Sequence, residues 1–267
     1  HLECRMKTVA SADGTLIAYE LGGDGPPLLL VHGTTGSRAS FASIRPRFEE
    51  HFTVTTMDRR GCGNSGDSLE YAIEREFEDV ATVVNEVGAP VLLFGHSYGA
   101  LCALGAAMRT DKLSGLILYE PWISEGERLY SPEQLEPLDT LLASGDREGV
   151  VRTFFGEIMG KPPPEIELRA TLPTWPGRIA SAHKIPRECR VEETYRLPAD
   201  DVGKLSIPVL LLLGGDSPPF AGRVNAMLEK ALPNARTVVM AGQQHGAINT
   251  GPELVISAVL NFWRDIA

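Results

Sequence analysis

Apolar residues fall into short runs that alternate with longer stretches of helical periodicity. Nearly continuous runs of Leu, Val and Ile are typical of strands buried on both faces of a parallel sheet. The runs cover residues 16–21, 27–31, 52–57, 90–94, 113–119, 208–213 and 237–240. Helices are predicted over residues 41–50, 71–87, 98–109, 220–232 and 253–266. The alternation predicts an α/β fold with a doubly wound, mostly parallel sheet. Residues 7–10 and 16–21, separated by Asp13-Gly14, predict an opening hairpin.

The alternation breaks after residue 120, where helical patterns continue without a strong strand. Ser131-Pro132-Glu133-Gln134 is typical of a helix start, and Asp146 can cap a following helix. We therefore predict a core of residues 7–120 and 204–267, with residues 121–203 inserted as a helical lid. Its aromatic residues are candidates either for packing inside the lid or for the wall of a substrate pocket: Trp122, Phe154, Phe155 and Trp175.

Charge and cysteine content narrow the classes of function. The formal net charge is −10, and basic clusters are absent from the sequence, which argues against nucleic acid and acidic membrane surfaces as partners. The chain has 4 cysteines without metal-site spacing, so we expect reduced thiols, no metal and a cytoplasmic location. No apolar stretch of membrane-spanning length occurs. The N-terminus lacks an apolar signal core, and Met6 is expected as the native start.

The segment Gly95-His96-Ser97-Tyr98-Gly99 matches the G-x-S-x-G motif. An apolar run precedes it and an Ala- and Leu-rich helical pattern follows, which is the strand–turn–helix context that the motif requires. Such a turn exposes the serine hydroxyl, and side chains at positions 95 and 99 would collide with the neighbouring helix and strand. Ser97 is therefore the predicted nucleophile. His96 is expected to have a structural role, because adjacent side chains on this turn point apart.

A serine hydroxyl needs a base to remove its proton, and in this type of site the acid and histidine follow the serine in the chain. After Ser97 the chain offers His183, inside the predicted lid, and His245, after the last predicted strand. We predict His245 as the base. Asp216 follows the strand over 208–213 and is the predicted acid, while Glu120, after the strand over 113–119, is the alternative.

Stabilising an oxyanion requires two backbone N–H donors, one from the residue after the nucleophile and one from the loop after an early strand. These positions are Tyr98 and Thr34. Gly61-x-Gly63-x-x-Gly66 also fits a dinucleotide fingerprint, but it does not open directly into a helix. We interpret it as a tight turn and expect no nicotinamide, flavin or other cofactor.

Taken together, these motifs resemble the α/β-hydrolase superfamily, especially small bacterial esterases, C–C hydrolases and cofactor-free haloperoxidases. The resemblance covers residues 7–120 and 204–267. It rests on the His32-Gly33 turn, the segment 58–66, the Ser97 motif, Gly214-Gly215-Asp216 and His245. Many relatives carry an aromatic or long apolar residue at position 34, so the Thr found here departs from the pattern.

The resemblance implies acyl transfer on a small-molecule substrate, with Ser97 attacking a carbonyl carbon and water releasing the acid. A carboxylic ester with a small or medium acyl group is the first candidate. Lactone hydrolysis, C–C hydrolysis and perhydrolysis use the same residues and stay open, because a fold alone does not select a reaction. A ligand sensor with very slow turnover is the alternative of another class. The oligomeric state stays open.

Overall fold

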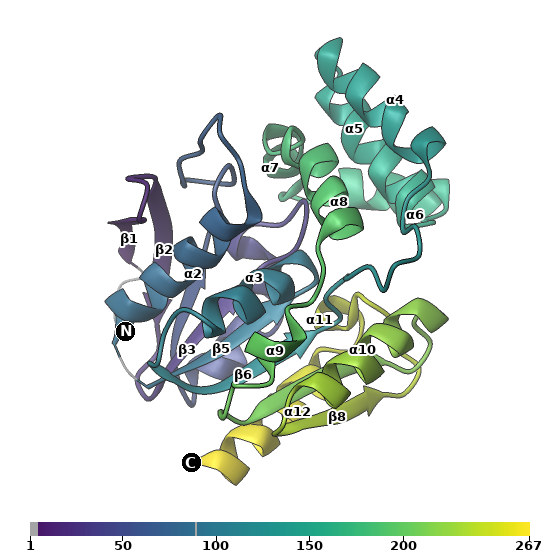
Figure 1. Cartoon of the computed structure of the whole chain (residues 1–267). Helices are drawn as coiled ribbons and strands as arrows, with labels where there is room; N and C mark the ends of the chain where they lie inside the picture. Colours follow the sequence, from purple (N-terminus) through teal and green to yellow (C-terminus); the bar gives the residue numbers. More distant parts are fainter. Residues whose placement is uncertain (1–4, 89) are drawn as a thin grey trace.

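The core is one eight-stranded sheet in the computed structural model, which describes residues 5–88 and 90–267 (Figure 1). Its strands are β1 (Arg5–Ala10), β2 (Leu16–Gly22), β3 (Pro27–Val31), β4 (Thr53–Met57), β5 (Val91–His96), β6 (Leu113–Tyr119), β7 (Val209–Gly214) and β8 (Ala235–Met240). They lie in the order β1-β2-β4-β3-β5-β6-β7-β8. β2 pairs antiparallel with β1 and β4, and the remaining pairs are parallel. The predicted opening hairpin and the mostly parallel sheet are therefore confirmed.

Helices cover both faces of this sheet, as the doubly wound prediction requires. On one face, α2 (Ile73–Val87), α3 (Tyr98–Ala107), α9 (Ala199–Val202) and α10 (Pro219–Ala231) share one apolar cluster with the strands. On the other face, η1 (Arg38–Phe41), α1 (Arg45–Glu49), α11 (Ala247–Thr250) and α12 (Pro252–Ile266) contribute to a second cluster. Strand residues such as Leu28, Leu92 and Leu210 are fully buried between these layers, which explains their continuous apolar runs.

Between β6 and β7 the chain forms helices that stand above the carboxyl ends of the strands (Figure 1). They are α4 (Pro132–Ala143), α5 (Arg147–Thr153), the π-helical turn η2 (Phe154–Ile158), α6 (Pro163–Ala170), α7 (Trp175–Ala180) and α8 (Lys184–Thr194). We call α4 to α8 the lid. The Ser131–Gln134 capping box and the Asp146 cap begin α4 and α5 as predicted. A third apolar cluster lies within the lid, so this segment has a core of its own.

The helix predicted over residues 41–50 is in fact two short elements, η1 and α1. Pro46 explains the break, because it lacks the N–H that a continuing helix would need and is tolerated only in the first turn of α1. Cys62, Cys102 and Cys189 are buried free thiols, as expected, while Cys4 lies outside the described residues. Within the described part of the chain, no helix is long and apolar enough to cross a membrane.

Candidate active site

Ser97 occupies the sharp turn between β5 and α3, with φ 58° and ψ −128°. This left-handed conformation is uncommon outside glycine, and it points to a residue held in place by its surroundings. The turn begins a helix whose every residue is buried, so the serine is presented on a rigid element. Ser97 itself is half-buried, and its backbone N–H donates to the Tyr119 carbonyl at the end of β6.

Three glycines make this turn possible. A Cβ on Gly95 would lie 2.3 Å from the Gly99 carbonyl oxygen, and a Cβ on Gly99 would lie 2.3 Å from the Val31 carbonyl oxygen. These are the helix and strand collisions predicted for the motif. On the other side, a Cβ on Gly33 would lie 2.7 Å from Ser97 Cβ and 3.2 Å from Ser97 Oγ. The loop after β3 therefore packs directly against the serine.

Two backbone N–H groups flank this serine without hydrogen-bond partners among the described residues. Tyr98 N–H belongs to the first residue of α3, and Thr34 N–H belongs to the turn closed by the Gly36 N–H to Gly33 carbonyl bond of 3.1 Å. Thr35, in the same turn, has φ 61°. Unpaired N–H groups at a helix start and in a tight turn are suited to bind developing negative charge.

His245 lies next to this turn, in the loop between β8 and α11. Its Nδ1 is 2.8 Å from Glu120 Oε2, and its ring centroid is 4.8 Å from that of His96, the residue before Ser97. The His245 side chain is 18% exposed and that of Glu120 only 2%. Neither His245 Nε2 nor Ser97 Oγ has a hydrogen-bond partner within the described part of the chain. Both atoms are therefore free to engage each other or a substrate.

Glu120 directly follows β6. Its carboxylate contacts the end of β7 and the loop after β8. Its Oε1 accepts from the Gly214 N–H at 2.7 Å and from Ser217 Oγ at 2.6 Å, while Oε2 faces His245. Burial raises the pKa of this carboxyl, but the hydrogen bonds and the charge of His245 outweigh burial and lower it below its ordinary value. The backbone at Glu120 has φ 45°. Thr35, Ser97 and Glu120 are the non-glycine residues with positive φ in the described chain, and all three lie at this site.

The prediction that Asp216 pairs with His245 is wrong. Asp216 is exposed, and its backbone N–H bonds the Gln243 carbonyl at 2.8 Å. Sheet order does not explain this, because His245 follows β8 and β8 is the neighbour of β7. The local contacts explain it: Asp216 lies in an exposed turn, while the Gly214 N–H and the Ser217 hydroxyl bind the Glu120 carboxylate beside His245. Glu120, the alternative acid predicted from the sequence, is the carboxylate that contacts His245.

Residues at the ends of β5 and β6 also fix the loop that carries His245. His96 Nε2 is 2.8 Å from the His245 carbonyl oxygen, and burial lowers the pKa of His96 to about 3, so its ring is neutral. Tyr119 Oη donates to the Gln244 carbonyl and accepts from the Ala247 N–H at 3.0 Å. The structural role predicted for His96 agrees with these contacts. The Tyr119 contribution had no signal in the sequence.

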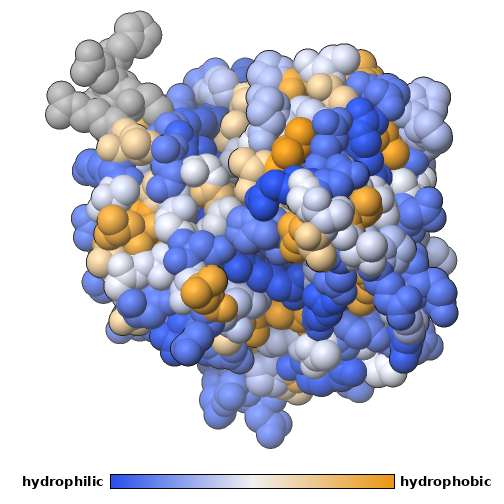
Figure 2. Space-filling model, turned by 90° about the horizontal axis from the view of Figure 1, so that it is seen from above, coloured by the Kyte–Doolittle hydropathy of each residue, from blue (hydrophilic) through white to orange (hydrophobic). Residues whose placement is uncertain are grey.

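The four aromatic lid candidates separate into two groups. The Trp122 ring is 5.9 Å from that of His245 and is half-buried, so it borders the site. Phe154, Phe155 and Trp175 are at most 6% exposed and belong to the apolar cluster inside the lid. Viewed from above, the molecule is mostly hydrophilic with scattered apolar residues, consistent with apolar lid side chains turned inward (Figure 2).

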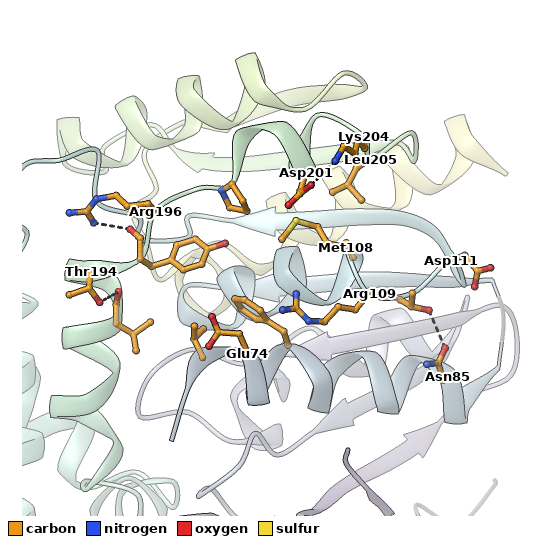
Figure 3. Close-up of a pocket in the computed structure, with 17 residues that line it drawn as sticks. Glu74, Asn85, Met108, Arg109, Asp111, Thr194, Arg196, Asp201, Lys204 and Leu205 are labelled. Atoms are coloured by element: carbon orange, nitrogen blue, oxygen red, sulfur yellow. Dashed lines mark hydrogen bonds and ion pairs between the residues drawn. The ribbon is translucent and has the colours of Figure 1, made fainter. Parts of the chain in front are cut away.

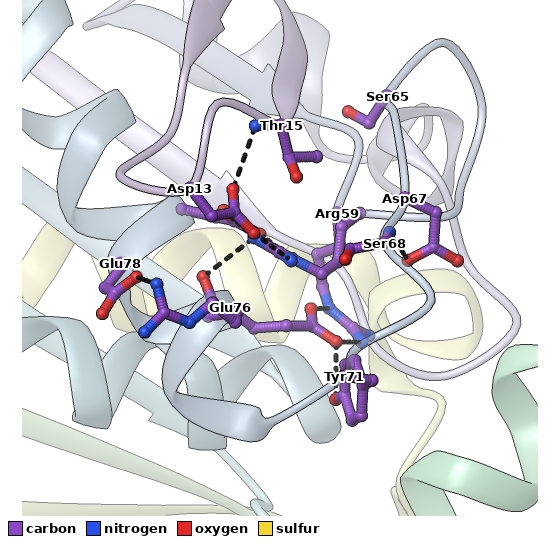
Figure 4. Close-up of polar contacts among 12 residues, drawn as sticks. Asp13, Thr15, Arg59, Ser65, Asp67, Ser68, Tyr71, Glu76 and Glu78 are labelled. Carbon is purple, nitrogen blue, oxygen red and sulfur yellow. Dashed lines mark hydrogen bonds and ion pairs between the residues drawn. The ribbon is translucent and has the colours of Figure 1, made fainter.

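A buried ionic network joins the lid to the core beside the site. Arg59, after β4, pairs with Glu76 of α2 at 2.8 Å and with Glu188 of α8 at 2.5 Å. Lys184 Nζ is 3.0 Å from Glu188 Oε1 and donates to Cys62 Sγ. Burial raises the pKa of Glu76, but Arg59 and Lys184 bring it down to about 2. Figure 4 shows the Arg59–Glu76 pair with the Tyr71 hydroxyl donating to Glu76.

A separate groove of about 1280 Å³ lies between α2, α3 and the segment 191–205 (Figure 3). Its lining includes Glu74, Arg109, Tyr195 and Lys204, and none of the residues Ser97, Glu120 or His245. Among the described residues, no cluster of three or more His, Cys, Asp or Glu side chains could hold a metal ion. The glycine-rich segment after β4 forms a turn in which Asp58 accepts from the Asn64 N–H, and α2 begins only at Ile73.

Comparison with known proteins relates this chain to α/β hydrolases. A family model described as "Alpha/beta hydrolase family" matches residues 28–258. An α/β hydrolase of known structure from Sphaerobacter thermophilus is 36% identical, with a TM-score of 0.83 over 96% of this chain and 100% of that one. A 2-(acetamidomethylene)succinate hydrolase of Mesorhizobium japonicum is 27% identical over 90% of this chain and 88% of its own. The esterase RhEst1 from Rhodococcus, 23% identical with a TM-score of 0.77 over 98% of this chain and 99% of its own, shares the fold.

Proposed function

Because the chain belongs to the α/β hydrolase family and is a hydrolase, we propose that it cleaves a small or medium carboxylic ester through an acyl-enzyme on Ser97. The observation that carries this proposal is the 2.8 Å contact between His245 Nδ1 and Glu120 beside the strained Ser97 turn. A nucleophile, a histidine and an acid that orients the histidine are the parts that serine acyl transfer requires.

In the first step Ser97 Oγ attacks the carbonyl carbon while His245 Nε2 takes its proton. The Glu120 carboxylate accepts from His245 Nδ1–H, which keeps Nε2 unprotonated and ready to act as a base. Once the proton is transferred, the same carboxylate stabilises the imidazolium. The bonds from Gly214 N–H and Ser217 Oγ hold the carboxylate in this orientation. His245 then returns the proton to the leaving group, and water activated by His245 releases the acid.

The negative charge that develops on the carbonyl oxygen needs donors already in place. The unpaired N–H groups of Thr34 and Tyr98 are our candidates for this oxyanion hole. Preorganised donors of this kind are worth roughly 10²- to 10³-fold each in kcat. Trp122 supplies an apolar wall beside His245. Exclusion of water by such a wall strengthens the oxyanion contacts.

An amide is the second candidate for the bond that is cleaved. The Mesorhizobium relative is named for a substrate with an acetamido group, and it matches nearly the whole of this chain. An amide has a less electrophilic carbonyl and a poorer leaving group than an ester, and His245 must protonate that leaving group. The residues proposed above can perform both reactions.

Hydrolysis of p-nitrophenyl acetate and butyrate by the wild type, Ser97→Ala and His245→Ala tests the proposal. Each variant should fold normally and lose about 10⁴- to 10⁶-fold in kcat, because the three residues act as a unit. Multiple rapid turnovers by the wild type favour an enzyme over a slow ligand sensor. Retained turnover by a folded Ser97→Ala protein would contradict the mechanism.

A further inference from the structure

One arginine of the lid reaches down to the loop beside the nucleophile. Arg178, in α7, donates through Nη1 to Thr35 Oγ1 at 2.6 Å and to the Thr35 carbonyl at 3.2 Å. Thr35 follows Thr34, the proposed oxyanion donor, in the turn whose Gly33 packs against Ser97 Oγ. The guanidinium therefore contacts the residue that directly follows the proposed oxyanion donor.

This guanidinium has no counter-charge among the residues that the structure describes. Within the described residues, no carboxylate lies in ion-pair range of Arg178, and its Nε and Nη2 groups make no hydrogen bond. Burial, reinforced by the positive charge of Arg169, lowers the pKa of Arg178 to about 10, so it is still a cation at neutral pH. Arg178 is half-buried. A partly desolvated cation is usually paired with a negative group in proteins. A bound substrate can supply one.

A second arginine strengthens the positive character of this place. Arg169 lies 5.1 Å from the centroid of the Phe155 ring, and Arg178 lies 5.5 Å from the same ring. Arg169 is bound to Glu165 at 2.6 Å, but its Nε is buried and has no hydrogen-bond partner in the described part of the chain. Two guanidinium groups therefore lie around one ring, and donors on both have no hydrogen-bond partner among the described residues.

We propose that Arg178, supported by Arg169, binds a carboxylate carried by the substrate, which makes the substrate a half-ester or half-amide of a dicarboxylic acid. A carboxylate fits because a single unpaired guanidinium matches its one charge and its two coplanar oxygens. The inference rests on the proposed function of Ser97 and assigns a substrate class to that site. It also explains why a lid residue contacts the strained Thr35, since an anion bound there would sit beside the acyl carbonyl.

The test compares matched acyl groups with and without a terminal carboxylate. Mono-p-nitrophenyl glutarate and adipate are paired with p-nitrophenyl pentanoate and hexanoate, after subtraction of spontaneous hydrolysis. The wild type should prefer the anionic member of each pair in kcat/KM. In Arg178→Gln this preference should fall by about 10- to 100-fold, the usual strength of a charge-assisted hydrogen bond. Arg178→Lys keeps the charge but loses the two-pronged geometry and should be intermediate.

Arg152→Gln is the control for loss of a lid charge. Arg152 stacks on Trp175 and is paired with Glu148 and Glu167, away from Thr35, so its removal should leave the preference unchanged. If Arg178→Gln instead lowers kcat/KM equally for both members of a pair, Arg178 only supports the loop and the inference is wrong. The same conclusion follows if the wild type shows no preference.

A binding measurement separates this inference from the proposed function. In Ser97→Ala protein, calorimetry should detect glutarate but not glutaramide, and Arg178→Gln in the same background should abolish glutarate binding. Glutarate binding that depends on Arg178 supports the anion site even if no ester is turned over. Rapid ester turnover without glutarate binding overturns the anion site and leaves the proposed function standing.

Discussion

Glu120→Gln is the sharpest test of how His245 is held. The Gly214 N–H and the Ser217 hydroxyl both donate to Oε1, so the amide oxygen of Gln must stay on that side. The amide nitrogen then faces His245 Nδ1 and donates to it. This forces the proton onto Nε2, and His245 can no longer accept a proton from Ser97.

The expected loss follows from that wrong tautomer together with the missing charge. An acid-to-amide exchange of this kind in a serine triad lowers kcat by about 10⁴-fold, or about 5 kcal/mol of transition-state stabilisation. The fold should tolerate the change, because the amide oxygen still satisfies both donors. Glu120→Asp, which keeps the charge but shortens the side chain, should lose less.

The assay is kcat for p-nitrophenyl butyrate, with circular dichroism and thermal melting to verify folding. Asp216→Asn is the matched control. Asp216 is exposed and does not contact His245, so its kcat should stay within about twofold of wild type, as expected for a surface change. The reasoning is refuted if folded Glu120→Gln keeps kcat within tenfold of wild type, or if Asp216→Asn is the more damaging change.

Four further predictions concern Gly99, Trp122, Phe154 and Glu192. Gly99→Ala places a methyl group 2.3 Å from the Val31 carbonyl oxygen and should cost about 1–3 kcal/mol in urea unfolding as well as activity, whereas Gly222→Ala, with open space around it in α10, should be neutral or stabilising. Trp122→Ala should change the chain-length profile of p-nitrophenyl ester hydrolysis by up to about 200-fold, because Trp122 borders His245. Phe154→Ala should instead leave that profile flat and destabilise the lid by about 3–5 kcal/mol; a changed profile would show that Phe154 lines the pocket. Glu192, in α8, is buried and accepts from the Tyr130 hydroxyl. Burial raises its pKa to about 8, so the folded protein retains a proton that the unfolded chain loses, and stability should fall as pH rises from about 4.5 to 8. Glu192→Gln should remove up to about 5 kcal/mol of that dependence, and identical wild-type and variant unfolding curves at pH 5 and pH 8 would contradict this.

The strands and the Ser97 turn could be predicted from the sequence because each depends on local pattern. Buried strands were predicted over residues 27–31 and 113–119, and the strands of the structure have the same limits. The acid could not be assigned in this way, because its identity depends on the backbone conformation and hydrogen bonds of the loops after the strands. Glu120 and Asp216 both follow apolar strands, and only the tertiary contacts show that Glu120 is the one beside His245.

The lid was less predictable for a related reason. Its helices have apolar faces, but a sequence pattern does not distinguish a face that packs inside the lid from one that faces a substrate. Phe154 and Trp175 proved to be internal, while Trp122 borders His245. Arg178 had no sequence signal at all. Its importance comes from the absence of a carboxylate around it in the described structure.

The ionic network around Arg59 determines which part of the lid can move. Detaching α8 would separate Arg59 from Glu188 in a buried environment, and breaking such a pair costs about 3–5 kcal/mol. Fewer than about one molecule in a hundred would then have α8 detached at any time. α8 should therefore stay docked on the core, and movement of the lid should be concentrated in α4 and α6. Amide hydrogen exchange should accordingly be slow along α8 and faster along α4 and α6, and a substrate would enter under the outer lid helices rather than past Arg59.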